Sequence, residues 1–293
     1  MDFRKLIYAA SVILAFSCSG YVDPGQEDAE EDEGKENVTP PATDVVSDYR
    51  QQMVAMQFTS TGCTNCPLLA TALKNIRKNM PGTIIPVAFH MDYDTPDPMS
   101  LPVCTRFYEK VSMRDDKVIG LPMFALNFTR PSEHIVNEYA KIASEIDKQQ
   151  KANPVRCGVA LQAEYSAQEK KVSVTARFKS DVEAPFRYHI LLLEDGISYP
   201  QAGSDVADYV HDNVLRAVSA DDVRGDRLDS GRDLVPRQEY VVEKTFTVAD
   251  SWNVSNLKVV AAMLTLDEAS AWYSNNANVC PVGGSADYQY IQK

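Results

Sequence analysis

In the first half of the chain, continuous apolar runs alternate with segments whose apolar residues have helical spacing. The runs predict three buried strands, with the sequences MVAMQFTST, TIIPVAFHMD and IGLPMFALNF. After the first run, a helix that ends before Pro81-Gly82 is expected to bury one face, formed by Leu69, Leu73, Ile76 and Met80.

Two further helices complete this pattern. A short one is expected near Cys104 to Val111, and a long one opens at Pro131-Ser132. The apolar face of the long helix consists of Ile135, Tyr139, Ile142 and Ile146. The order strand, helix, strand, helix, strand, helix over residues 50–152 predicts an α/β layer with a largely parallel sheet.

The second half of the chain changes its pattern after Asn153-Pro154. Several short runs alternate apolar with polar residues, as from Val172 to Phe178. Seven runs are strand-like: CGVALQAEYS, KKVSVTARFKS, FRYHILLLED, DNVLRAVSA, EYVVEKTFTVAD, NLKVVAAMLTLD and ANVCPV. They predict an all-β immunoglobulin-like sandwich, so the expected folded domains are residues 49–153 and 154–293. The segment from Ile197 to Tyr209 is long for a connection within a hairpin.

The N-terminus has the pattern of a secretory signal peptide, expected over residues 1–17. Two basic residues precede an apolar run from Leu6 to Phe16, which is too short to span a membrane. Ser17 before Cys18 resembles the lipobox of bacterial lipoproteins, although Phe16 stands where that motif usually has a small residue. The resemblance implies cleavage before Cys18, lipidation of its thiol and a membrane anchor. The alternative is a plain secretory signal with an incidental cysteine.

Residues 18–48 lack periodicity and predict an acidic, disordered tether. Between Asp23 and Glu36, eight acidic residues stand against Lys35 alone. This run resembles the surface-export signal of some Gram-negative anaerobes; the alternative is a solvated spacer. The whole chain carries a net charge of −12, which argues against non-specific binding to nucleic acids.

The chain has six cysteines, and export would place them where disulfides persist. Lipidation of Cys18 would leave five thiols, an odd number. Cys157 and Cys280, in the first and last predicted strands of the sandwich, are candidates for a structural disulfide. Cys104 is then left over, either as a buried apolar thiol or as a further redox thiol.

The stretch TSTGCTNCPLL places Cys63 and Cys66 between a predicted strand and a predicted helix. Cys63 is expected just before the helix N-terminus, where free N–H groups lower the pKa of a thiol. Cys66 follows about one turn later, within reach of a mixed disulfide on Cys63, so the pair suits thiol–disulfide exchange.

Two alternatives for this pair remain open. A metal site would need two more ligands, and His90 and Cys104 are the nearby candidates in sequence. A purely structural bridge would close so short a loop that it would contribute little stability. The four histidines are scattered, and each is expected to be structural or on the surface: His90, His134, His189 and His211.

Residues 50–152 resemble the thioredoxin superfamily, through Cys-Thr-Asn-Cys after a strand and Gly120-Leu121-Pro122 before a later one. The resemblance implies that Cys63 attacks and Cys66 resolves. It also implies that Pro122 is a cis-proline beside the disulfide, with Leu121 presenting its backbone to a substrate.

Three features depart from that superfamily. Gly62 stands in place of the usual tryptophan, and residues 129–131 leave no room for the closing hairpin strand. No clear acidic residue occupies the buried position behind the disulfide.

The whole chain resembles the outer membrane protein 28-related lipoproteins. The resemblance is carried by the lipoprotein start together with the motifs TGCTNCP, GLPMFALN and HDNVLRA. It implies an outer membrane lipoprotein with a thioredoxin-like domain and an immunoglobulin-like C-terminal domain. Some members of that family have been described as adhesins or receptors, so the resemblance does not define a reaction.

Two functional hypotheses follow. The first is a lipid-anchored thiol–disulfide oxidoreductase of the cell envelope, which needs no cofactor but needs envelope protein thiols or a redox partner. The second is a surface lipoprotein whose sandwich binds an envelope or host ligand, with the cysteine pair non-catalytic. An exposed Cys63 beside a cis-proline favours exchange, and a buried Cys63 favours binding.

Overall fold

The computed structural model describes residues 47–112, 120–130 and 138–291. The predicted signal peptide (1–17), Cys18 and nearly all of the predicted tether (18–48) lie outside these residues. None of the helices in the described ranges has the length and apolar character that a membrane crossing requires.

The predicted alternation of strands and helices is confirmed in the first half of the chain. Its elements are β1 (Met53–Thr59), α1 (Cys66–Asn79), β2 (Ile84–His90), α2 (Pro102–Ser112), β3 (Met123–Leu126) and α3 (Tyr139–Ala152). β1 and β2 are parallel, but β3 is antiparallel to β1, so the prediction of a largely parallel sheet is wrong for β3. Alternation alone does not fix strand direction: β3 starts beside Phe58, near the end of β1, and runs back to Ala55.

The apolar faces of the helices are largely as predicted. On α1, the buried predicted residues are Leu69, Leu73 and Ile76. On α3, Ile142 and Ile146 are buried, whereas Tyr139 is 38% exposed and was wrongly assigned to the buried face. Ile135 lies outside the described residues.

Each of the seven runs predicted as strands in the second half contributes a strand. The longer strands are β4 (Cys157–Ser166), β5 (Lys171–Ser180), β7 (Arg187–Glu194), β10 (Val214–Val218), β13 (Glu239–Thr247), β14 (Leu257–Leu266) and β15 (Trp272–Pro281). The short ones are β6 (Ala184–Pro185), β8 (Ile197–Ser198), β9 (Val210–His211), β11 (Asp226–Arg227), β12 (Asp233–Leu234) and β16 (Gly284–Ala286). Two 3-10 turns occupy Leu228–Gly231 and Val254–Asn256.

One sheet crosses the predicted domain boundary at residues 153 and 154. Its strand order is β15-β14-β7-β10-β2-β1-β3, with β11 paired to β7. The junction is formed by β10 and β2, where the N–H of Ala88 donates to the carbonyl of Asn213 at 2.8 Å. The described residues therefore form a mixed α/β fold, in which the β-rich half shares a sheet with the first half rather than forming an isolated immunoglobulin-like sandwich.

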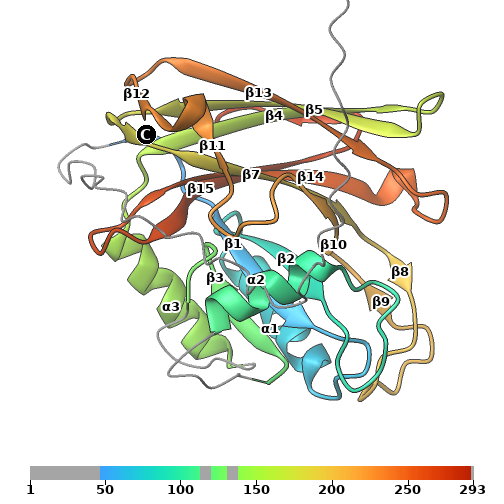
Figure 1. Ribbon diagram of the computed structural model, residues 1–293. Coiled ribbons are helices and arrows are strands. Elements are labelled where there is room, and N and C mark those ends of the chain that lie inside the picture. Colours follow the sequence, from blue (N-terminus) through green and yellow to red (C-terminus); the bar gives the residue numbers. More distant parts are fainter. Residues whose placement is uncertain (1–46, 113–119, 131–137, 292–293) are drawn as a thin grey trace, which may run out of the picture. The chain divides into compact units, whose positions relative to one another are not determined.

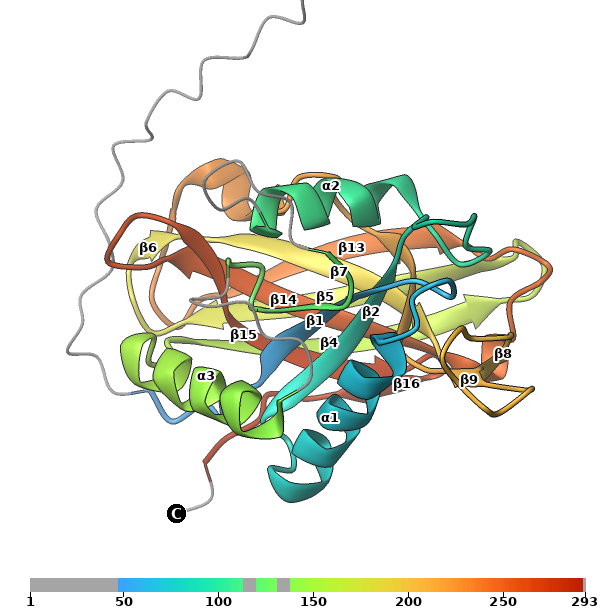
Figure 2. The ribbon, with the colours of Figure 1, turned by 90° about the horizontal axis from the view of Figure 1, so that it is seen from below.

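The long sheet is covered on both faces (Figures 1 and 2). The four-stranded sheet β13-β5-β4-β16 packs on one face of β7, β14 and β15, and α2 packs on the other face of the long sheet. α1 and α3 pack against β1 and β3. Ile190 and Leu192 of β7 face the four-stranded sheet, whereas Leu191 and Leu193 face the core that contains Phe107 of α2. Burial on both faces explains why β7 reads as a continuous apolar run rather than an alternating one.

The predicted disulfide between Cys157 and Cys280 is wrong: both cysteines are free and buried. The side-chain amide of Asn276 donates to the carbonyl of Cys157 at 2.8 Å, and that of Asn278 donates to the carbonyl of Val159 at 2.9 Å. This register carries Cys280 about four residues beyond Cys157, roughly 13 Å along the strand at the usual rise per residue. A disulfide requires Cα atoms within about 7 Å.

Candidate functional site

Cys63, in the loop that joins β1 to α1, and Cys66, the first residue of α1, form a disulfide with their Cα atoms 5.4 Å apart. Both residues are buried, with exposed fractions of 3% for Cys63 and 1% for Cys66. The peptide bond between Leu121 and Pro122 is cis, as predicted. Because Met123 pairs with Phe58, this cis peptide lies at the same end of β1 as the disulfide loop.

A hairpin from the second half of the chain packs on this loop. β8 and β9 pair with each other, and we call residues 199–209 between them the covering loop. The side-chain amide of Gln201 donates to the carbonyls of Cys63 at 2.9 Å, Ser60 at 3.1 Å and Thr61 at 3.2 Å. The N–H of Ala202 also donates to the carbonyl of Thr61, at 2.8 Å. The covering loop thus fixes the backbone around Cys63.

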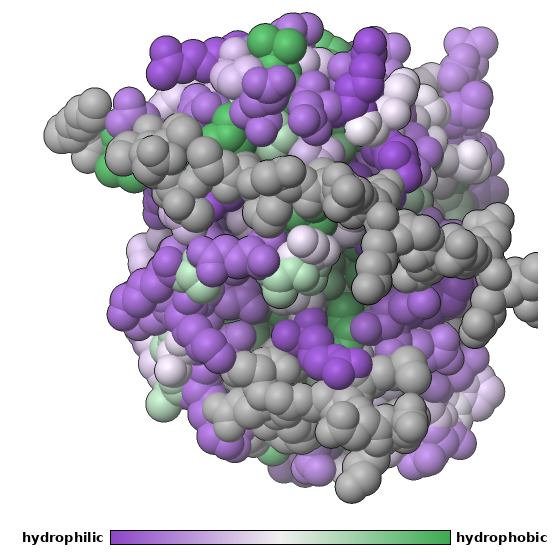
Figure 3. Space-filling model, turned by 60° about the vertical axis from the view of Figure 1, so that its left-hand side comes forward, coloured by the Kyte–Doolittle hydropathy of each residue, from purple (hydrophilic) through white to green (hydrophobic). Residues whose placement is uncertain are grey.

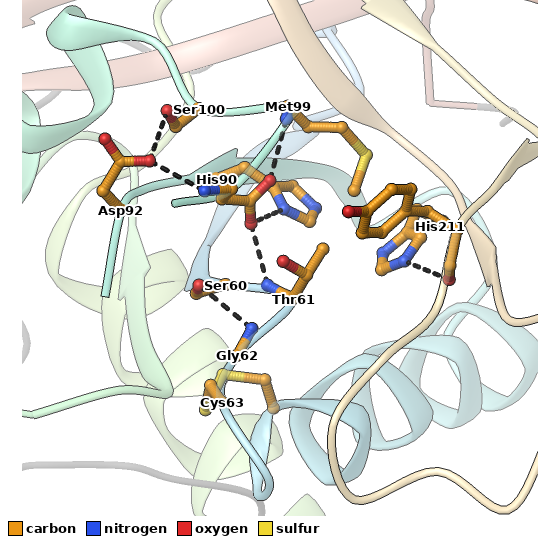
Figure 4. Close-up of polar contacts among 12 residues, drawn as sticks. Ser60, Thr61, Gly62, Cys63, His90, Asp92, Met99, Ser100 and His211 are labelled. Carbon is orange, nitrogen blue, oxygen red and sulfur yellow. Dashed lines mark hydrogen bonds and ion pairs between the residues drawn. A yellow bond between two sulfur atoms is a disulfide. The ribbon is translucent and has the colours of Figure 1, made fainter. Parts of the chain in front are cut away.

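A buried carboxylate, that of Asp97, also bonds to the backbone of the disulfide loop; Figure 4 shows the residues around it, Thr61, His90 and Met99. Asp97 accepts hydrogen bonds from the N–H of Thr61, from Nδ1 of His90 and from the N–H of Met99, each at 2.8 Å. Burial alone would raise the pKa of Asp97, but the hydrogen bond and charge of His90 and the two N–H groups lower it overall. Sequence analysis found no acidic residue behind the disulfide, yet Asp97 is joined to it through the backbone of Thr61.

His90 and His211 meet beside this carboxylate, with their rings edge to face and 5.2 Å apart. Nε2 of His211 donates to the carbonyl of Tyr199 at 3.2 Å, which leaves Nδ1 without a proton. Burial, followed by the neighbouring His90, lowers the pKa of His211 to about 4. His211 is therefore a neutral acceptor at pH 7.

The other histidines are not part of this cluster. His189 is buried, stacks on Phe128 with ring centroids 4.7 Å apart, and bonds to the carbonyl of Val223. It has the structural role expected for it, and His134 lies outside the described residues. No cluster of three or more metal-binding side chains occurs in the described ranges. Cys104 is a free thiol of α2 that lies in the core, and burial raises its pKa to about 12.

A cavity of about 330 Å³ opens next to the disulfide. Its walls are α1 and the β9 side of the hairpin, and its floor is formed by β1 and β2. Cys66 lines the cavity, and Cys63 is not among the lining residues. The polar lining residues are Gln57, Thr59, Thr71, Lys74, Arg77, His90, Gln201, Tyr209, His211, Asp212 and Asn213.

The family model described as outer membrane protein Omp28 matches residues 111–279, more than half of the chain. The chain belongs to the Omp28 family. The predicted family and the predicted outer membrane localisation are thereby confirmed. No curated protein matches this Omp28-family chain.

Two solved structures resemble the Omp28-family fold. HBP35 of Porphyromonas gingivalis shares 18% identity with a TM-score of 0.65, and the match covers 84% of this chain and 80% of HBP35. Protein AGR_C_4864 from Agrobacterium tumefaciens shares 12% identity with a TM-score of 0.53, covering 82% of this chain and 97% of that one. At such identities the likeness concerns the fold alone.

In this Omp28-family protein, Gly62 is explained by packing. A side chain at Gly62 would meet Oγ1 of Thr95, which lies 2.7 Å from the position of a Cβ atom. The space beside the Cα atom of Gly62 is thus occupied by Thr95, in the loop after β2. Two residues of the site were not assigned to it from the sequence. Gln201 comes from the segment Ile197 to Tyr209, identified only as a long connection, and His211 opens the motif HDNVLRA, used only for the family resemblance.

Proposed function

We propose that this protein is a lipid-anchored, thioredoxin-like member of the Omp28 family that exchanges thiols and disulfides through Cys63 and Cys66. The observation that carries the proposal is the closed disulfide between β1 and α1. The arrangement of β2, β1 and β3, parallel and then antiparallel, supports the thioredoxin-like assignment of this half.

The start of α1 favours the thiolate that exchange requires. The N-cap residue Asn65 makes no side-chain capping bond, and the first turn carries no acidic residue. Pro67 has no N–H, and the N–H groups of Cys66 and Leu68 bond to the carbonyls of Cys63 and Asn65. The helix dipole is therefore the feature that would stabilise a negative charge on the nearby Cys63 once the disulfide is reduced. Cys66, one turn later, would resolve a mixed disulfide between Cys63 and a client.

Burial of Cys63 sets a condition on this chemistry. Gln201 and Ala202 hold the covering loop against the backbone of residues 60–63. With an exposed fraction of 3%, Cys63 is closed to a protein client in this conformation. We infer that exchange with protein thiols is gated by the covering loop, and that envelope protein thiols or a redox partner complete the cycle.

The test is the redox equilibrium of the pair in the full chain carrying Cys18→Ser. The protein is equilibrated with dithiothreitol couples, and each thiol is read by differential alkylation and mass spectrometry. A potential between roughly −120 and −270 mV, in the range of known exchange proteins, supports the proposal. A pair that stays oxidised well below about −300 mV contradicts it.

A second candidate is favoured by the 3% exposure of Cys63. In this alternative the protein is a binding lipoprotein whose β-rich half recognises an envelope or host ligand, and the disulfide is structural. Hydrophilic residues cover most of the coloured face in Figure 3, with hydrophobic ones in small groups, so recognition on that face would be polar. A Cys63→Ser/Cys66→Ser variant that keeps ligand binding, combined with a pair that resists reduction, would favour this candidate.

A further inference from the structure

The cavity beside the disulfide is bounded in part by the covering loop, through Gln201 and Tyr209, and opens toward Cys66. Gln201 bonds to the carbonyl of Cys63, whereas Cys66 lines the cavity. Its volume of about 330 Å³ lies at the lower end of the range typical of small-molecule pockets. A small molecule in this cavity would meet the Cys66 side of the disulfide without displacing the covering loop.

The rim of the cavity is positively charged. Lys74 and Arg77 lie one turn apart on α1, are exposed, and line the cavity. Within the described part of the chain, neither makes an ion pair with an acidic side chain. Asp212, on the opposite wall, already accepts a hydrogen bond from the N–H of Gly196 at 3.0 Å. The two unpaired cations suit a ligand with a carboxylate.

The floor of the cavity carries polar groups at buried positions. Gln57 is a residue of β1 with an exposed fraction of 9%, and its side chain makes no hydrogen bond among the described residues. Its amide atoms are not fully enclosed, so they remain open to the cavity, where a ligand or water can bond to them. His211, another lining residue, has an unprotonated Nδ1 that can accept a hydrogen bond.

We propose that this cavity binds a small thiol that carries a carboxylate, and that this thiol reduces the Cys63–Cys66 disulfide. The inference rests on the proposed exchange function and names its reductant. The carboxylate lies at Lys74 and Arg77, and the thiol points along α1 toward Cys66. A neutral or cationic thiol lacks the interaction of the carboxylate with Lys74 and Arg77.

The reaction consumes two molecules of the thiol. The thiolate of the first attacks the sulfur of Cys66, the bond between Cys66 and Cys63 breaks, and Cys63 leaves as a thiolate near the N-terminus of α1. The second thiolate attacks the sulfur of the bound first molecule. The symmetrical disulfide of the ligand is released, and Cys66 leaves as a thiolate. The two ligand thiols are oxidised, their two electrons reduce the protein disulfide, and their protons pass to the two cysteines.

The experiment compares three small thiols that differ in charge: 3-mercaptopropionate, 2-mercaptoethanol and cysteamine. Second-order rate constants for reduction of the disulfide are measured at fixed pH and low salt in the full chain carrying Cys18→Ser. The variant is Lys74→Gln/Arg77→Gln, and the matched control is Lys78→Gln, an exposed residue of α1 that does not line the cavity. For each thiol, the rate constant of the variant is divided by that of the parent. This ratio does not depend on the intrinsic reactivity of the thiol.

We expect the double substitution to lower the rate constant for reduction by 3-mercaptopropionate by about 3- to 30-fold. The rate constant for 2-mercaptoethanol should stay within about twofold of the parent value, and that for cysteamine should not fall. Lys78→Gln should leave all three rates within about twofold. Equal effects on the three thiols, or no effect on 3-mercaptopropionate, would overturn the inference.

A non-reactive probe separates this inference from the proposed function. Binding of 3-(methylthio)propionate, which has no thiol, is followed by the NMR shift of the Gln57 side-chain amide, and it should be lost in the double variant. If dithiothreitol reduces the pair while the rate with 3-mercaptopropionate does not depend on Lys74 and Arg77, exchange stands and the inference fails. If no thiol reduces the pair in the folded protein, the proposed exchange and its reductant both fail, whatever the probe does.

Discussion

Among single residues, Asp97 contributes most to the order of the site, because its carboxylate joins the disulfide loop to β2. Its two oxygens accept from the N–H of Thr61, from His90 and from the N–H of Met99. An amide in its place would offer one acceptor oxygen and would turn an NH₂ group toward one of these donors. The arrangement therefore depends on a carboxylate rather than on any polar side chain of that size.

We expect Asp97→Asn to lower the free energy of unfolding by about 2 kcal/mol, the usual effect of losing buried hydrogen bonds to a charged group. The measurement is urea unfolding at pH 7. Asp94→Asn, a change at an exposed residue of the same loop, is the control and should have little effect. Equal stabilities of Asp97→Asn and the parent would contradict the role assigned to Asp97.

His211 makes the stability of the folded state depend on pH. Its pKa is lowered to about 4 in the folded state, against about 6.5 for a free histidine. As pH falls below 6.5 the unfolded chain takes up a proton that the folded chain refuses, so stability falls between about pH 6.5 and 4.

His211→Gln should remove part of this loss, since a glutamine amide can still donate to the carbonyl of Tyr199 but does not titrate. Between pH 7 and pH 4.5, the free energy of unfolding should drop by on the order of 1 kcal/mol less in the variant than in the parent. Urea unfolding at the two pH values measures the difference. Parallel losses in both proteins would show that His211 does not carry the effect.

At the scale of elements, the covering loop is the part of the site whose position a single substitution can change. Gly203 has a φ of +76°, and a Cβ atom there would collide with the carbonyl oxygen of Thr64. Gly283 has a similar φ of +85°, but a Cβ atom there would meet nothing within 4 Å. An alanine would be strained by the positive φ at either position, but only at Gly203 would its Cβ atom collide with another residue. The two substitutions are therefore a matched pair.

We expect Gly203→Ala to push the covering loop off the disulfide and to raise the rate of reduction by dithiothreitol about 3- to 10-fold, on the order of the effect of losing one hydrogen bond. Gly283→Ala should leave the rate unchanged, although both substitutions should cost stability because of the positive φ. Rates are measured by quenched alkylation. A Gly203→Ala rate equal to that of Gly283→Ala would mean that the loop does not limit access.

The seven strand-like runs and the helical spacing of α1 were sufficient to predict those elements, because periodicity reports local burial. The direction of β3 and the partner of the 197–209 segment were not predictable, because both depend on packing between distant segments. Asp97 was missed for a related reason: nothing in the letters MDYDTPDPMS indicates which of three aspartates turns inward.

The pairing of Cys157 with Cys280 was predicted wrongly for the same reason, because it depends on packing between distant segments. Cys63 and Cys66 are close in sequence, so a helix start suffices to bring them together. Cys157 and Cys280 lie on strands whose relative register is set by the asparagines of β15, which bond to the backbone of β4. Sequence position identified the right pair of strands and could not give the offset between them.

At the scale of the whole described molecule, the question is whether the boundary at residues 153 and 154 separates two folding units. The sheet runs through that boundary by the pairing of β10 with β2. Residues from both halves also share one core, in which Phe89 and Phe107 pack with Leu193 and Val260. Removing either half would expose apolar surface of the other, so the two halves should depend on each other for stability.

We therefore expect the chain to unfold in one transition. Two signals can be assigned to different halves: in the described residues the α-helices lie before Asn153, while Trp252 and Trp272 are the chain's two tryptophans and lie in the second half. Ellipticity at 222 nm and tryptophan fluorescence should give the same urea midpoint and the same slope. Val214→Pro, which distorts β10 at the residue that pairs with Ala88 of β2, should lower both midpoints together. If the parent instead gave two separated midpoints, the predicted boundary would mark two independent domains, and the shared sheet would be only a docking contact between them.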